Sequence, residues 1–169
     1  MVFDYYKRLT ASERWVYRKS DEITSVRLSK ATELHPLVEK LDKVLTKEKR
    51  EEIEVLCQKI VSHMTARLKA PDIRVKVLAV RPTKSYGELH GLYVPSEGQT
   101  PATITLWMRT AQKRKVVAFR TFLRTLLHEI CHHLDYELLG LPYSFHTEGF
   151  YKRESSLFHQ LVRKGIKRV

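Results

Sequence analysis

The 169-residue sequence contains only two cysteines, Cys57 and Cys131, and no apolar run approaching the length of a membrane span. Such a span needs about 20 consecutive apolar residues. The cysteines lie far apart on what would be apolar helix faces, and no apolar segment follows the charged N-terminus as in a secretory signal. These absences predict a soluble, cytoplasmic protein in a reducing environment, without membrane association.

Glycine and proline are also scarce, with six of each, and no low-complexity linker or internal repeat is visible. The hydrophobic content of 43% is enough to build a core. We therefore expect one compact unit, in which an N-terminal helical segment, residues 1–70, packs on the same core as residues 71–169.

Acidic residues are fewer than basic ones: the sequence has 19 Asp and Glu and 31 Lys and Arg, which gives a net charge of +12. A positive surface attracts polyanions, so nucleic acid is a candidate partner. The basic residues are spread through the chain, however, and such charge often serves solubility alone. The residues expected to form a basic surface are Arg74, Lys76, Arg81, Lys84, Lys113, Arg114, Lys115, Lys152, Arg153, Arg163, Lys164, Lys167 and Arg168.

The spacing of apolar residues changes along the chain and predicts an α+β fold. A three-to-four spacing predicts helices over residues 34–45, 53–68, 116–138 and 150–162. A period of two predicts strands over residues 73–77, 89–94 and 102–109. We expect a small, mostly antiparallel sheet packed on the long helix over 116–138, with N-terminal helices on one side and a closing C-terminal helix.

The long predicted helix carries the pentad His128-Glu129-Ile130-Cys131-His132, an H-E-x-x-H motif. Side chains four residues apart lie above one another on a helix, so His128 and His132 can point at one ion. Glu129 need not touch that ion, and in the usual mechanism it takes a proton from a zinc-bound water. Histidines that only pack or bind backbone carbonyls are the structural alternative. The motif predicts two Zn²⁺ ligands, His128 and His132, and a catalytic general base, Glu129.

A catalytic zinc usually has three protein ligands, and two residues compete for the third position. His146 follows His132 after thirteen residues, beyond the break at Gly140 and Pro142. Glu154 falls within the apolar stripe of the last predicted helix, where it is either the third ligand or a residue that holds the ligands in place. Ligand type and position favour His146.

Three further residues around this motif have open roles. Asp135 lies near the face of His128 and either orients a ligand imidazole or is solvated near the helix end. Tyr143 and Tyr151 flank the expected third ligand, and each is a candidate donor to the oxyanion that forms during hydrolysis.

Over residues 71–164, the order of strands, H-E-x-x-H helix, break, histidine and helix resembles SprT-like zinc metallopeptidases. The segment His146-Thr147-Glu148-Gly149-Phe150 is similar to the family's H-G-x-x-F pattern, with Thr147 in place of glycine. The resemblance implies a zincin-like catalytic core over 71–169 that hydrolyses protein or peptide substrates, with zinc bound by His128, His132 and His146. A weaker resemblance to minimal gluzincins would place Glu154 on the zinc.

The expected function is thus zinc-dependent peptide-bond hydrolysis. The alternative is a basic, nucleic-acid-associated module with a zinc site, and a DNA-associated SprT-like protease would combine the two.

Overall fold

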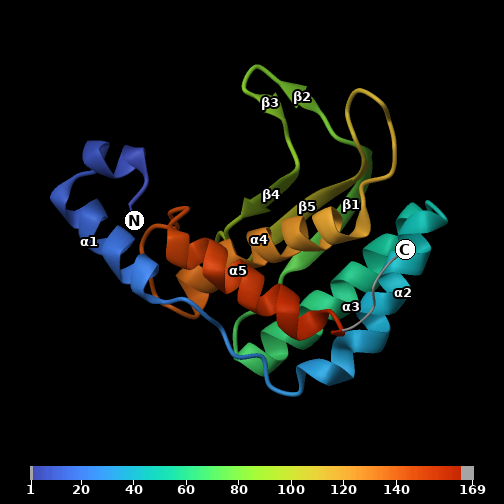
Figure 1. Cartoon of the computed structure of the whole chain (residues 1–169), viewed down its shortest axis with the longest axis horizontal. Helices are drawn as coiled ribbons and strands as arrows, with labels where there is room; N and C mark the ends of the chain where they lie inside the picture. Colours follow the sequence, from blue (N-terminus) through green and yellow to red (C-terminus); the bar gives the residue numbers. More distant parts are fainter. Residues whose placement is uncertain (1, 165–169) are drawn as a thin grey trace.

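The structure is a computed structural model that describes residues 2–164, and Figure 1 shows its arrangement. None of the helices in this part of the chain has both the length and the hydrophobicity needed to cross a bilayer. The helical elements are η1 (Asp4–Arg8), α1 (Ala11–Glu22), η2 (Ala31–Leu34), α2 (His35–Thr46), α3 (Arg50–Leu68), α4 (Phe119–Glu137) and α5 (Glu148–Leu161). The strands are β1 (Arg74–Val80), β2 (Thr83–Lys84), β3 (Gly87–Glu88), β4 (Gly91–Val94) and β5 (Thr103–Arg109). The α+β class expected from the sequence is confirmed.

The main sheet has the strand order β1-β5-β4 and is mixed, whereas the sequence predicted a mostly antiparallel sheet. β1 runs parallel to β5, and β4 runs antiparallel to β5. The short strands β2 and β3 form a separate antiparallel hairpin. β5, the last of the three strands in sequence, lies between β1 and β4.

Burial explains why β5 takes the central position. Its residues Ile104, Leu106, Trp107 and Met108 are all buried, so both faces of this strand are covered. β1 and β4 instead expose one face each, which suits strands at the edges of a sheet. The alternation of apolar and polar residues identified the side chains that face the core, but it carries no information about which strands are neighbours.

Helices α3 and α4 cover the face of the sheet to which Val75, Val77, Ile104 and Leu106 point. Helix α2 packs on α3, and α5 lies beside α4 on the side away from the sheet (Figure 1). One hydrophobic core joins all these elements. Helix α4, which carries the H-E-x-x-H motif, is therefore held between the sheet and α5.

Two residues expected on a basic surface are buried instead. Arg81 is 6% exposed and pairs with Glu88 at 3.1 Å, while Arg153 is 1% exposed and pairs with Asp135 at 3.0 Å. A buried guanidinium needs a carboxylate partner, which removes these charges from the surface. The expected basic residues Lys167 and Arg168 lie outside the described residues.

Helix α1 packs directly against the beginning of α5. A β-carbon at Gly149 would lie 2.5 Å from the carbonyl oxygens of Ser20 and Asp21, so only glycine permits this approach. The Gly149 amide donates to the Asp21 carboxylate at 2.9 Å. The end of α1 and the start of α5 therefore form one contact at backbone distance.

Replacing Gly149 with alanine should lower the free energy of unfolding by about 1–3 kcal/mol, the usual cost of overpacking, because the methyl group would separate α1 from α5. Urea denaturation followed by circular dichroism measures the change. Lys152→Ala, on the exposed side of the same helix, is the control and should change stability by less than about 0.5 kcal/mol. Equal stabilities of the two variants would contradict the close contact.

Candidate metal centre

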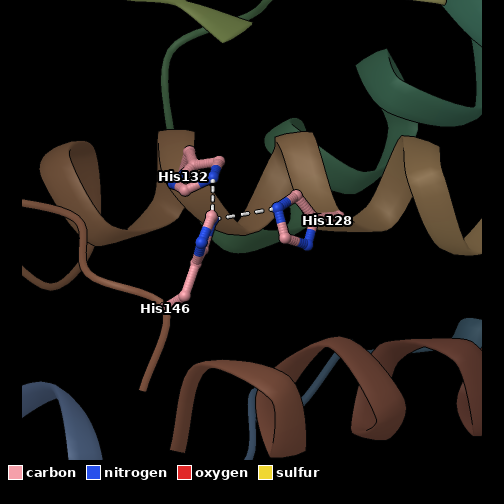
Figure 2. Close-up of side chains that lie close together, drawn as sticks. All are labelled: His128, His132 and His146. Carbon is pink, nitrogen blue, oxygen red and sulfur yellow. Dashed lines mark hydrogen bonds between the residues drawn. The ribbon is translucent and has the colours of Figure 1, made fainter. Parts of the chain in front are cut away.

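Three histidine rings converge at the open side of α4 (Figure 2). His128 and His132 lie one turn apart on this helix, as the sequence motif requires. His146 comes from the loop between α4 and α5 and reaches toward both rings. The side chains that meet at this point are thus separated by up to eighteen residues in sequence.

The spacing of the ring nitrogens fits a single small ion. The Nε2 atom of His146 lies 3.1 Å from Nε2 of His128 and 3.0 Å from Nε2 of His132. Three ligand atoms, one from each residue, all lie within 4.8 Å of one another, so the cluster is close enough to hold a metal ion. Imidazole nitrogens about 2.05 Å from a tetrahedral zinc would lie about 3.3 Å apart, close to the two distances seen in this cluster.

The ring of Phe150 lies beneath all three histidines. Its centroid is 4.9 Å from that of His128, 4.8 Å from that of His132 and 5.2 Å from that of His146, and the side chain is fully buried. An apolar floor limits the rotation of the imidazoles and the access of water from below. The packing of Phe150 therefore limits the movement of all three imidazole rings.

A carboxylate sets the tautomer of His128. Nδ1 of His128 lies 3.0 Å from Oε1 of Glu154, which is largely buried and also faces Arg124 at 3.7 Å. A carboxylate only accepts hydrogen bonds, so the ring proton must be on Nδ1. Nε2 could then coordinate a metal, and Glu154 orients the His128 ring from outside the cluster of the three histidines.

The hydroxyl group of Ser144 sets the tautomer of His132. Ser144 donates its single proton to Oδ2 of Asp135 at 2.7 Å, and its oxygen lies 2.7 Å from Nδ1 of His132. Because that proton is used, Ser144 must accept from Nδ1 of His132. Asp135 thus orients the imidazole of His132 through Ser144, and it is fully buried, so the expected alternative that it is solvated is wrong.

Burial keeps the imidazoles of His132 and His146 neutral. Burial, and to a smaller extent the neighbouring His128 and His146, lowers the pKa of His132 to about 3. Burial and His128 also lower the pKa of His146, against a smaller opposite effect of Glu154. Neutral imidazole is the form that coordinates metals, so neither ring needs to lose a proton at neutral pH before binding.

Glu129 lies in the wall of the cleft next to the histidines. Burial raises its pKa to about 7, His128 acts in the opposite direction, and Glu154 raises it further. Its carboxylate faces Gly91 of β4, where a β-carbon would lie only 2.9 Å from Oε1. A carboxyl group whose pKa is near the working pH is suited to general base catalysis.

An open cleft of about 720 Å³ runs between β4 and the α4–α5 pair, and the three histidines and Glu129 line it. The candidate oxyanion donors Tyr143 and Tyr151 do not belong to the cleft lining found among residues 2–164, although the ring of Tyr151 lies 5.9 Å from that of His146. The tyrosines that do line it are Tyr93 and Tyr136.

Sequence reasoning missed two residues of this centre, Ser144 and Tyr93. Tyr93 stacks on the ring of His132 at 6.4 Å, and its hydroxyl binds Nδ1 of His133. Strand alternation places Tyr93 on the face of β4 that points to α4, which was the only available signal. Nothing in the sequence around Ser144 distinguishes it from an ordinary loop serine.

Thr147, where this chain departs from the H-G-x-x-F pattern, has a defined role. It is the N-cap of α5, and its hydroxyl accepts from the Phe150 amide at 2.9 Å. The same hydroxyl lies 3.0 Å from that of Ser20 in α1. A threonine therefore fits this position through its hydroxyl group.

Comparison of the chain with protein-family models, with curated proteins and with solved structures gave no match in any of the three. A function for this chain therefore has to be argued from the geometry of the site.

The choice between His146 and Glu154 leads to a direct prediction. The parent protein should bind about one zinc per chain. His146→Ala should lose stoichiometric zinc because a ligand is removed, while Glu154→Ala should weaken affinity about 10- to 100-fold, as is usual for a residue that orients a ligand. Elemental analysis and competition with a chelator measure both effects.

His90→Ala is the matched control, since His90 lines the same cleft outside the histidine cluster and should leave zinc binding unchanged. Stoichiometric zinc in His146→Ala together with its loss in Glu154→Ala would assign the third ligand to Glu154.

Proposed function

We propose that the protein is a zinc-dependent metallopeptidase of the zincin type. The observation that supports this proposal is the convergence of three imidazole Nε2 atoms beside a buried carboxylate, all facing one open cleft. The resemblance to SprT-like metallopeptidases leads to the same expectation.

The three histidines would hold zinc through their Nε2 atoms, and the residues around them fit that role. When bound, zinc supplies a Lewis acid that lowers the pKa of a water molecule toward about 7 and polarises a carbonyl group. His128 and His132 already carry their protons on Nδ1, away from the ion. The centre therefore needs little rearrangement to bind the metal.

Glu129 would perform the proton transfers. Its carboxylate accepts the proton of the attacking water and then delivers it to the amine that leaves the cleaved peptide bond. Burial supports this role, because it raises the pKa of Glu129 to about 7, a value at which the group both accepts and donates a proton readily.

The free edge of β4 would hold the substrate as an added strand. At the other edge of the sheet, side chains of α3 bind the main chain of β1 and of the residue before it. Gln58 accepts from the Val75 amide and donates to the Ile73 carbonyl oxygen, and Glu54 accepts from the Val77 amide. Among the described residues β4 pairs with β5 alone, and Gly91, Leu92 and Tyr93 line the cleft. An extended peptide can therefore add to the sheet at β4, directly beside Glu129.

The proposal predicts that Glu129→Gln keeps its zinc but loses peptidase activity by about 100- to 10,000-fold, because glutamine cannot accept the proton. Hydrolysis of an unfolded protein substrate, or of a mixture of quenched-fluorescence peptides, measures activity, and elemental analysis measures zinc. Glu137→Gln is the control, since Glu137 is an exposed residue of the same helix. Full activity in Glu129→Gln would contradict the proposed mechanism.

A second candidate function is the binding of nucleic acid by two loops that extend from the same side of the sheet (Figure 1). These are the β2–β3 hairpin and the loop between β5 and α4, and the Ala111 amide joins them by donating to Glu88. Tyr86 at the hairpin tip is 75% exposed, and the loops present exposed basic residues. Exposed aromatic rings among cations are typical of surfaces that stack single-stranded bases.

This second function predicts that Lys113→Glu, Arg114→Glu and Lys115→Glu together weaken binding of a single-stranded oligonucleotide. They should also reduce the salt dependence of binding by about one unit of slope for each phosphate that is no longer neutralised. Fluorescence anisotropy at several salt concentrations measures both effects.

A control with the same change in net charge carries Lys19→Glu, Lys40→Glu and Lys59→Glu, which are exposed on α1, α2 and α3. Equal weakening by both triple variants, or affinity that does not depend on salt, would argue against binding at these loops.

A further inference from the structure

The N-terminal segment makes two sets of contacts that lead to the candidate metal centre, although it lies more than a hundred residues away in sequence. It comprises η1, α1 and the residues that join them. Its aromatic residues Tyr5 and Tyr17 pack against Phe145, the residue before the ligand His146, with ring centroids 6.4 and 6.2 Å away. The loop that carries the third histidine is thus covered by this segment.

The first contact acts on the backbone of His146. The Tyr5 hydroxyl donates a hydrogen bond of 2.9 Å to the His146 carbonyl oxygen. The loop between α4 and α5 has no regular secondary structure at this residue. A side chain from η1 therefore holds the main chain of the one ligand that no helix positions.

The second contact acts on His132 through a chain of buried polar groups. Arg153 donates to the Ser20 and Ile23 carbonyl oxygens at 2.5 and 2.6 Å, and to the Ser20 hydroxyl at 2.9 Å. The same guanidinium donates to Oδ1 of Asp135 at 3.0 Å. The position of Arg153, and with it that of Asp135, depends on the end of α1.

Asp135 connects Arg153 to His132 through Ser144. Its other oxygen, Oδ2, accepts the proton of Ser144, and Ser144 accepts the Nδ1 proton of His132. Each link in this chain has a single arrangement of donors and acceptors, because Arg153 only donates and the Asp135 carboxylate only accepts. Displacement at α1 would therefore turn or free the ring of His132.

We propose that the N-terminal segment is a positioning element of the metal centre, which holds His146 through Tyr5 and His132 through Ser20, Arg153, Asp135 and Ser144. This inference rests on the proposed metal site. Tyr5 and Ser20 are positioning residues, since they act through other groups and touch neither metal nor substrate. The segment raises metal affinity by ordering two ligands before the ion binds.

The test compares zinc affinity in two conservative variants, one for each contact. Tyr5→Phe removes only the hydroxyl that binds the His146 carbonyl, and Ser20→Ala removes the hydroxyl that binds Arg153 and Thr147. Each should weaken zinc binding about 3- to 10-fold, the effect of the one hydrogen bond in each variant that leads to a histidine: from Tyr5 to the His146 carbonyl oxygen, or from Arg153 to Ser20. Competition with a chelator measures affinity, and the visible absorption of bound Co²⁺ reports ligand geometry independently of any peptidase activity.

The chain offers a matched control for each variant. Tyr6→Phe removes a neighbouring hydroxyl of η1 that binds Arg18 instead of the metal loop. Thr65→Ala removes a buried hydroxyl on α3 that binds its own helix at Val61. Both controls should keep zinc affinity and the Co²⁺ spectrum within about twofold of the parent, at a similar small cost in stability to urea.

The outcomes separate this inference from the proposed metal site. Parent affinity and an unchanged Co²⁺ spectrum in Tyr5→Phe and Ser20→Ala would overturn the positioning role and leave the metal site in place. Failure of the parent protein itself to bind Zn²⁺ or Co²⁺ would overturn the metal site. Weakening in the controls as large as in the test variants would show a general effect of stability and would also overturn the inference.

Discussion

The buried ion pair between Arg153 and Asp135 is the interaction on which the arrangement of the helices around the candidate metal centre depends. The two side chains are 1% and 0% exposed, and they join α5 to α4 while Arg153 also binds the end of α1. Two charges taken out of water are costly unless hydrogen bonds satisfy both. Four bonds from the two terminal nitrogens of the Arg153 guanidinium and one to Asp135 from Ser144 provide most of that compensation, while Nε of Arg153 is buried without a hydrogen-bond partner among the described residues. Burial raises the pKa of Asp135, and Arg153 and Ser144 act against that rise. The pair therefore holds three helices in one arrangement and, through Ser144, sets the position of His132 in the histidine cluster.

The two edges of the main sheet differ in a way that suits the proposed chemistry. Side chains of α3 occupy the outer backbone of β1, so that edge is closed to a further strand. β4 forms the wall of the cleft, and Gly91 allows it to approach Glu129 at contact distance. A substrate strand would thus be guided to the one edge at which the histidines and Glu129 lie. The mixed topology, which the sequence did not predict, places β4 at this edge.

Much of the candidate site could be predicted because it is local. His128, Glu129 and His132 belong to one helix, and the pitch of a helix alone brings residues four apart to one face. Glu154 was recognised as a carboxylate that needs a partner in an apolar stripe, and its partner is Nδ1 of His128. Ser144 and Tyr93 could not be found in this way, since their roles depend on contacts with His132 that only the folded chain creates.

By itself, the sequence determined the helices α2, α3, α4 and α5, the three strands of the main sheet, the residues of each that face the core, and the pair of histidines with the glutamate between them. The helices η1 and α1 and the β2–β3 hairpin were not predicted. The period of a helix or a strand alone decides which of its residues share a face, so this pattern can be read from the order of residues. Tertiary structure alone decided that β5 lies between β1 and β4, that His146 meets the helix histidines, and that Arg81 and Arg153 are buried. It also brought Tyr5 to the carbonyl group of His146. Each of these depends on packing between segments far apart in the chain, where shape and the pairing of buried polar groups select one arrangement among many with the same local pattern.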